Sequence, residues 1–343
     1  MKVVFEKKDY MLCSVPVPKG YPQSQTHVGV MKLGGSTLLT SSPYPSVRRE
    51  TWKEYLRAII RRLSFGYFCK NIRGEFFENP CLYISADGIS FRLLRARPLM
   101  ETPDPEFGLP AFNSDPDLFI ESNNIYTLNR AIYRTKLTPE RKRDEYIIRI
   151  YLIKGQLINN KYKYISTSLF KETTDLIVSP CLTYFKGKYI YTSLWTNCYN
   201  DGEDFDGMRF IKSNTIDGLS NNENWLPIEV NTDIWIPWHM SLFVHNDTLY
   251  TIVACVKRGQ PRRCYQMLGV FDQKLQKLTI YPQPLTDYNS YRGAAYVDYN
   301  DQFVLYSTTV DEKLKGGMSC DGREIIMTSK LTFREVLRKV QGE

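Results

Sequence analysis

The chain has 343 residues, of which 43% are hydrophobic and 24% charged, a globular composition that excludes a disordered or collagen-like chain. Its 45 basic and 37 acidic residues give a net charge of +8, and the basic residues are scattered instead of alternating with aromatic side chains. No nucleic-acid partner is therefore predicted. Tyrosine is abundant, with 24 residues, as expected for strands and for surfaces that stack on sugar rings.

The first residues, Met1 to Lys8, lack the apolar run of a secretory leader, and no stretch approaches the roughly 18 apolar residues of a spanning helix. We therefore expect no membrane span and a place in the cytoplasm. The eight cysteines form no Cys-x-x-Cys pair. Cys81 and Cys181 lie in apolar strands, where a free thiol behaves as a small hydrophobe, so the cysteines are expected to be mostly reduced.

Five segments repeat one pattern: a polar or small residue, an alternating strand, a short turn with Gly, Asn or Asp, and a second strand rich in aromatic and β-branched residues. Their register positions lie 88, 64, 59 and 55 residues apart, close to the roughly 45–65 residues of one propeller blade. The pattern predicts an all-β, five-bladed β-propeller, residues 1–343 forming a single domain. The innermost strands of the blades are expected to begin near His27, Asp115, Ser179, Trp238 and Gly293.

Two helices are predicted outside the strand repeats. Residues 49–63 carry apolar side chains at helical intervals, which predicts an amphipathic helix inserted into blade one. This insertion explains why the first two register positions lie 88 residues apart. Its arginines are expected to be solvated. The run from Leu331 to Val340 predicts a short C-terminal helix over 331–340.

Blade geometry predicts which residues meet. The start of a blade's first strand, the end of its second and the start of its third share one face of the central channel. Their carboxylates, imidazoles, guanidinium groups and aromatic rings suit a polar, ring-shaped ligand. The predicted catalytic residues are Asp115, Asp117 and Glu78. The predicted ligand-binding residues are His27, Tyr44, Arg130, Ser179, Trp195, Trp238, His239 and Arg292.

An acidic loop, Asp201 to Gly207, lacks the closing glutamate of an EF-hand. A solvated loop is expected there, with a structural calcium ion as the alternative. No other metal and no cofactor is predicted.

Three segments, Ser114–Phe119, Ser179–Tyr191 and Ser85–Phe91, resemble the five-bladed propeller superfamily of glycoside hydrolases, families 43 and 32 and their relatives. The resemblance spans roughly residues 20–325. It implies hydrolysis of a glycosidic bond by carboxylates at the channel mouth, one ionised and one holding a proton. Only Asp115 matches an acidic position of the family. His27, Ser179 and Trp238 or His239 occupy the other positions, as in a divergent member.

Three functions remain open. A divergent glycosidase would use Asp115 or Asp117 with Glu78 as acid and base, assisted by His27 and His239. A carbohydrate-binding propeller would bind an oligo- or polysaccharide without turnover. A structural or adaptor propeller would show neither binding nor turnover.

Overall fold

The computed structural model describes residues 2–19, 21, 24–44, 78–104, 106–107, 111–136, 145–196, 205–310 and 322–343. The helix predicted over 49–63 and most of the acidic loop at 201–207 lie outside these residues. Within them strands dominate, in agreement with the all-β prediction. The helical elements of the described residues are η1 (Lys7–Asp9), α2 (Ile216–Ser220) and α3 (Phe333–Gln341).

The strands described form four sheets. One four-stranded sheet consists of β2 (Ser24–Leu33), β3 (Ser36–Tyr44), β4 (Cys81–Ser85) and β5 (Arg92–Leu93). A second consists of β6 (Ala111–Glu121), β7 (Asn124–Lys136), β8 (Glu145–Ile158) and β9 (Lys161–Thr173). A third consists of β18 (Ser290–Val297), β19 (Phe303–Val310), β20 (Gly322–Thr328) and β1 (Met11–Leu12).

The remaining sheet has eight strands in two antiparallel halves. Its first half comprises β10 (Ile177–Phe185), β11 (Lys188–Thr196), β12 (Phe205–Ser213) and β13 (Leu226–Val230). Its second half comprises β14 (Trp235–His245), β15 (Thr248–Lys257), β16 (Gln260–Phe271) and β17 (Lys277–Ile280). The halves join through parallel pairing of β13 with β17, at Glu229↔Lys277 and Val230↔Leu278.

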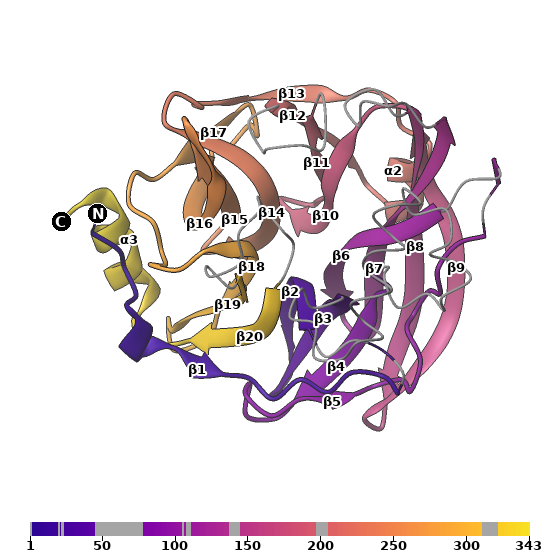
Figure 1. Cartoon of the computed structure of the whole chain (residues 1–343), viewed down its shortest axis with the longest axis horizontal. Helices are drawn as coiled ribbons and strands as arrows, with labels where there is room; N and C mark the ends of the chain where they lie inside the picture. The colour runs from indigo at the N-terminus through magenta and orange to yellow at the C-terminus, as the bar shows by residue number, and fades with distance from the viewer. Residues whose placement is uncertain are drawn as a thin grey trace, which may run out of the picture.

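The sheets are arranged around a common centre (Figure 1). In the described part of the chain, β2, β6, β10, β14 and β18 surround this centre, and each contacts the next in a closed ring. We call these the inner strands. The short strand β1 pairs with β20, with Met11 opposite Met327 and Leu12 opposite Ile326. The N-terminal and C-terminal parts of the chain therefore complete one sheet together, which closes the ring.

Tight hairpins connect the strands because the turn residues tolerate positive φ. Asn159 and Asn160 have φ of +51° and +59°, Lys186 and Gly187 +48° and +77°, and Asn246 and Asp247 +46° and +53°. Positive φ at both central positions is the type I′ turn, whose twist matches that of the flanking strands. These turns therefore pair each strand with the next strand in the chain.

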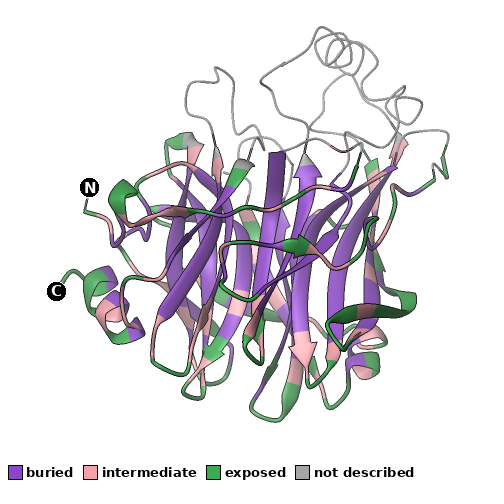
Figure 2. Ribbon diagram, turned by 90° about the horizontal axis from the view of Figure 1, so that it is seen from below, coloured by how far each residue is buried: buried purple, intermediate pink, exposed green. Residues whose placement is uncertain are grey.

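The core lies between adjacent sheets. Buried residues run through the strands, whereas exposed residues gather at the hairpin turns (Figure 2). Apolar clusters join neighbouring sheets; Leu38 and Leu82, for example, pack with Leu118 and Ile125. The structure describes four buried free cysteines, Cys13, Cys81, Cys181 and Cys255, and Cys264 is buried as well.

The helix α3 occupies most of the predicted C-terminal segment and anchors it to the sheet formed by β18–β20. Thr332 and Glu335 form a capping box at its start. Phe333, Val336 and Val340 are buried, and the Phe333 ring stacks 5.6 Å from that of Phe303. The helix thus stabilises the sheet in which the two ends of the chain meet.

We predict that Phe333→Ala lowers the free energy of unfolding by about 3–5 kcal/mol, because it empties a fully buried aromatic position. Arg334→Ala, an exposed neighbour in the same helix, should change it by less than about 0.5 kcal/mol. Urea unfolding of both variants measures the difference. Equal stabilities would show that α3 does not stabilise the ring.

Candidate functional site

A β-bulge interrupts each inner strand near its start. The ladder registers shift between Thr26 and Gly29, Ser114 and Asp117, Val178 and Cys181, Pro237 and His239, and Ser290 and Gly293. At three of these bulges, His27, Asp115 and Ser179 have φ of +53°, +50° and +51°. Side chains other than glycine rarely adopt this conformation, and such bulges re-aim a side chain. The end of the ring at which the inner strands begin is called the pole below.

The carboxylate of Asp115 lies at the centre of the pole and is fully enclosed. Its Oδ1 lies 3.0 Å from His27 Nδ1 and 3.3 Å from Ser114 Oγ. Its Oδ2 lies 3.0 Å from Arg130 Nη2 and accepts from the Ser179 backbone N–H at 3.0 Å. Each oxygen therefore faces two polar groups, and the side chain is 0% exposed.

Charges around Asp115 keep it ionised. Burial alone would raise the pKa of this carboxyl. The Arg130 guanidinium and the charged imidazole of His27 outweigh burial and hold the pKa of Asp115 well below its usual range. Asp115 thus fixes negative charge at the point where several inner strands converge.

The imidazole of His27 bridges two carboxylates. Its Nε2 lies 2.6 Å from Glu78 Oε2, and its Nδ1 faces Asp115. Burial would lower the pKa of His27, but Glu78 and Asp115 together raise it. Ser114 Oγ donates to Glu78 Oε2 at 2.7 Å and lies 3.3 Å from Asp115 Oδ1. The two carboxylate oxygens, Glu78 Oε2 and Asp115 Oδ1, are therefore at most about 6.0 Å apart. The result is an ion chain of carboxylate, imidazolium and carboxylate.

Glu78 is the most accessible carboxylate of this chain of groups. Its side chain is 11% exposed, compared with 0% for Asp115 and 7% for Asp117. Among the described residues, Glu78 Oε2 contacts His27 and Ser114, whereas Oε1 has no hydrogen-bond partner. One oxygen of Glu78 is therefore free to meet a ligand.

The imidazole of His239 differs from that of His27, because its surroundings favour the neutral ring. Ser179 Oγ accepts from the Met240 backbone N–H at 3.2 Å and lies 2.7 Å from His239 Nδ1. These two contacts hold the imidazole ring in place, since a hydroxyl can accept from the backbone N–H and still form a second hydrogen bond with Nδ1. Burial lowers the pKa of His239, and His27, Arg292 and Arg130 lower it further against the pull of Asp115. The buried Nε2 has no partner among the described groups.

Ser179 and His239 do not form a serine-hydrolase triad. In such a triad the two ring nitrogens divide between the serine and the aspartate. Here Nδ1 faces both, at 2.7 Å from Ser179 Oγ and 3.7 Å from Asp115 Oδ1. The serine positions the imidazole and is not activated by it.

Asp117 forms a second ion pair deeper in the ring. Its Oδ1 lies 3.3 Å from Arg292 Nη2, and its Oδ2 accepts from the Leu182 backbone N–H at 3.2 Å. Burial raises the pKa of Asp117 to about 6, although Arg292 and the backbone donors oppose the shift. Arg292 is fully buried, and its Nε and Nη1 have no partner in the described chain. The inner strand β6 thus carries two carboxyl groups with different pKa values: Asp115 is ionised, and Asp117 keeps its proton up to a pH of about 6.

Aromatic rings line one side of the pole. The ring of Tyr291 lies 5.2 Å from His27 and 4.4 Å from His239, and Trp238 packs 5.6 Å from His239. Tyr291 and Ser114 were not predicted from the sequence. Both are direct neighbours of predicted residues, and the bulge brings both members of each pair to the pole. A search that treated bulge residues as pairs would have found them.

The structure therefore brings together most of the predicted site. The residues linked at the pole are His27, Glu78, Asp115, Arg130, Ser179, Trp238 and His239, with Asp117 and Arg292 paired beside them. Trp195 lies elsewhere: its Nε1 donates to Asp175 and its ring packs 4.8 Å from Trp225 in an apolar cluster. The side chain of Tyr44 lies outside the described part of the chain.

The pole also contains a possible set of metal ligands. One donor atom each from His27, Asp115 and His239 lies within 4.8 Å of the others. Two imidazoles and a carboxylate suit zinc and other transition metals. In the present arrangement, however, His27 is paired with Glu78, and Arg130 already compensates Asp115. A cation could enter only if these ion pairs rearranged.

No family model and no curated protein matches the sequence. Solved structures do match it in fold. An N-acetylgalactosamine deacetylase from F. plautii, in complex with blood group B trisaccharide, is 13% identical with a TM-score of 0.59, over 96% of this chain and 95% of that one. A xylan beta-1,4-xylosidase from Bacillus halodurans is 13% identical with a TM-score of 0.58, over 92% of this chain and 54% of that one.

Zg3597, a family 117 glycoside hydrolase from Zobellia galactanivorans, is 12% identical with a TM-score of 0.54, over 95% of this chain and 90% of that one. The chain is a β-propeller. The predicted resemblance to the propeller superfamily of glycoside hydrolases is thus confirmed for the fold, at 12–13% identity. No helix among the described residues has the length and apolarity to cross a membrane.

We predict that Asp117→Asn removes part of the pH dependence of stability. A carboxyl whose folded pKa is about 6 and whose ordinary value is 3.8 binds protons more tightly in the folded state. It therefore lowers the free energy of unfolding as pH rises from about 4 to 6, by about 3 kcal/mol, since one pKa unit corresponds to about 1.4 kcal/mol. Urea unfolding at several pH values measures the wild-type-minus-variant difference. Parallel stability curves would contradict this titration.

Proposed function

We propose that this propeller hydrolyses glycosidic bonds in a glycan at the pole. The observation that carries the proposal is the ion chain Glu78–His27–Asp115, in which Glu78 retains a free oxygen. The solved relatives support it, since a xylosidase, a family 117 glycoside hydrolase and a deacetylase bound to a trisaccharide share this fold. We further propose that the propeller has five blades and one domain, the eight-stranded sheet counting as two blades.

The proposed roles follow from accessibility and charge. Glu78 exchanges a proton with the substrate, because its Oε1 is free and it is the least buried carboxylate of the pole. Asp117 is the second carboxyl, since its pKa of about 6 lets it take up a proton closer to neutral pH than an ordinary aspartate does. Asp115 keeps His27 charged and oriented, and all of its acceptor sites are taken.

Further residues are proposed to hold the sugar. His239 Nε2 and Arg292 present buried polar atoms with no partner among the described groups, and Trp238 offers an indole ring and an Nε1 that likewise has none. Buried polar atoms of this kind favour a ligand rich in hydroxyl groups, because an unpaired buried polar group is costly. Of the remaining predicted residues, Tyr44 stays part of the proposal at the end of β3, whereas Trp195 does not, because it packs against Trp225.

A second reaction is favoured by the group His27, Asp115 and His239. If a metal ion displaced the present ion pairs, these ligands would leave coordination positions for a water molecule. Such a site would suit removal of an acetyl group from an acetylated sugar, and the F. plautii relative is a deacetylase. Non-catalytic binding of an oligo- or polysaccharide, or a structural role, remains the outcome if no bond is cleaved.

We predict that Glu78→Gln and Asp115→Asn each reduce glycoside cleavage by about 10²- to 10⁴-fold, because one removes a proton-exchanging group and the other the charge that orients His27. Glu121→Gln is the matched control, since it lies at the other end of the strand that carries Asp115 and should leave the rate unchanged. Reducing-end release from a panel of polysaccharides measures turnover.

Thermal unfolding of all three variants must accompany these rates. If the wild type binds a glycan but cleaves none, the protein is a binding propeller and the proposal is wrong. Unchanged cleavage by a folded Glu78→Gln variant would also contradict it.

Chelation separates the two reaction classes. The glycosidase proposal predicts that EDTA leaves reducing-end release unchanged, because its acid–base groups belong to the protein. A metal-assisted deacetylase would instead release acetate from acetylated sugars and lose that activity in EDTA. Acetate release restored by added zinc would favour the second reaction over the first.

A further inference from the structure

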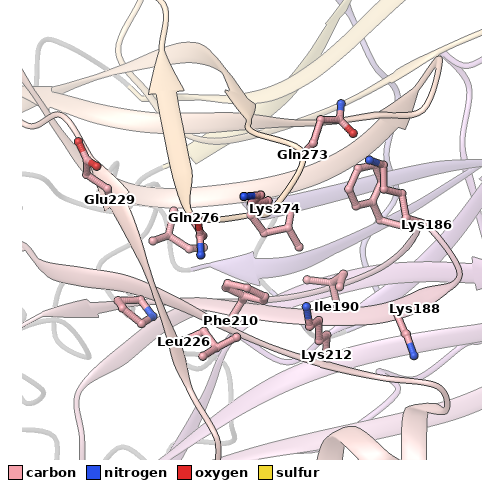
Figure 3. A pocket seen from close by; sticks show the side chains of 14 residues that line it. Lys186, Lys188, Ile190, Phe210, Lys212, Leu226, Glu229, Gln273, Lys274 and Gln276 are labelled. Carbon is pink, nitrogen blue, oxygen red and sulfur yellow. The ribbon is translucent and has the colours of Figure 1, made fainter.

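A cavity of about 850 Å³ lies between the two halves of the eight-stranded sheet (Figure 3). It is bounded by the turn between β10 and β11, by β12 and β13, and by the turn between β16 and β17. Phe185 on its wall follows Ser179 by six residues along β10, about 20 Å at the rise of a strand. This cavity, called the lysine pocket below, is therefore separate from the pole.

The floor of the lysine pocket is apolar. Ile190, Phe210 and Ile228 are buried beneath it, and Leu226 is 43% exposed beside Pro227. An exposed leucine and proline over a buried aromatic floor offer a flat surface for the C–H faces of sugar rings. The volume is in the range of sites that hold ligands of a few rings.

The rim is strongly basic. Lys186, Lys188, Lys212 and Lys274 line the pocket and are exposed. In the described part of the chain, none of these lysines forms an ion pair with a carboxylate. Glu229 is the acidic lining residue; it lies at the end away from Lys186 and Lys188 (Figure 3), and its carboxylate is 3.7 Å from Lys277. Positive charge therefore exceeds negative charge in this pocket.

Local backbone structure places the lysines on the rim. Lys186 occupies the first central position of a type I′ turn. In the facing turn, Leu275 has φ of +62° and a buried side chain, so that Lys274 and Gln276 flank the opening on either side of it. The amide groups of Gln273 and Gln276 add hydrogen-bond donors and acceptors between the charges.

We propose that the lysine pocket binds an acidic oligosaccharide, a short glycan segment that carries carboxylate or sulfate groups. The ammonium groups match the anionic substituents, the glutamine amides match the hydroxyl groups, and the apolar floor matches the ring faces. The proposal rests on the proposed function in one respect: it makes the glycan that reaches the pole an acidic one. The lysine pocket would then hold one part of a long chain while another part lies at the pole.

Isothermal titration calorimetry of the full chain tests the proposal. The probes are a galacturonic acid hexasaccharide, a sulfated galactan hexasaccharide, a neutral galactan hexasaccharide and inorganic sulfate. The pocket variant combines Lys186→Gln, Lys212→Gln and Lys274→Gln. The control variant combines Lys154→Gln, Lys161→Gln and Lys163→Gln on the hairpin of β8 and β9, which removes the same charge elsewhere.

We expect at least one acidic hexasaccharide to bind the wild type and the control variant equally, and the pocket variant roughly 10- to 100-fold more weakly, since each exposed charge contact contributes a few-fold. Binding should weaken as salt screens the charges. Leu226→Ala should weaken binding further without changing the salt dependence. The two acidic probes distinguish carboxylate from sulfate recognition.

Several results would overturn the proposal. These are equal binding of neutral and acidic probes, binding of inorganic sulfate as tight as that of the hexasaccharides, no binding of either acidic probe, or equal losses in the pocket and control variants. Repeating the titration with Glu78→Gln separates the two proposals. Both proposals together predict that this variant keeps pocket binding while it loses cleavage. Pocket binding by a wild-type protein that cleaves no glycan would instead reject the proposed function and leave the lysine pocket in place.

Discussion

The enclosure of one ionised carboxylate, Asp115, is the interaction on which the pole depends. Its two oxygens join groups from separate parts of the ring: an imidazole of β2, a guanidinium of β7 and a backbone N–H of β10. Removing the charge would leave the buried Arg130 without its counter-ion and His27 paired with Glu78 alone, and an unpaired buried charge is strongly destabilising. Asp115 therefore specifies how neighbouring sheets meet, as well as the charge of the site.

The pole derives its chemistry from differences between equivalent positions. A bulge occurs near the start of each inner strand, and the residues it turns inward include His27, Asp115 and Ser179 at three of these positions. One imidazole lies between carboxylates and is charged, while the other lies among cations and is neutral. A symmetric fold thus produces an asymmetric site, in which Glu78 keeps the free oxygen.

Much of this arrangement can be predicted from the sequence, because it follows from local pattern. The inner strands begin two to four residues before the repeat positions, and turns such as Asn246–Asp247 adopt the expected positive φ. Strand order then brings the predicted residues to one end. The resemblance to glycoside hydrolase propellers rests on these same strand and turn motifs, which is why it holds for the fold at low sequence identity.

What could not be predicted depends on contacts between distant segments. Arg130 and a backbone N–H contact the carboxylate of Asp115, which leaves Glu78 as the accessible carboxylate. These contacts form only when three sheets are in place, so the sequence does not reveal them. Trp195 lies at the correct strand end, but it packs against Trp225, which follows it by thirty residues. The lysine pocket was missed for a similar reason, because its lysines come from separate strands and turns and form no sequence cluster.

The ionisation of the two imidazoles tests the account most directly. The chain has three histidines, so ¹⁵N NMR of the imidazole nitrogens in the wild type can be assigned with His27→Gln and His239→Gln. At pH 6.5, where an ordinary histidine is half charged, the account predicts that His27 carries protons on both nitrogens and that His239 is neutral. A neutral His27 or a charged His239 at this pH would contradict the ion chain around Asp115.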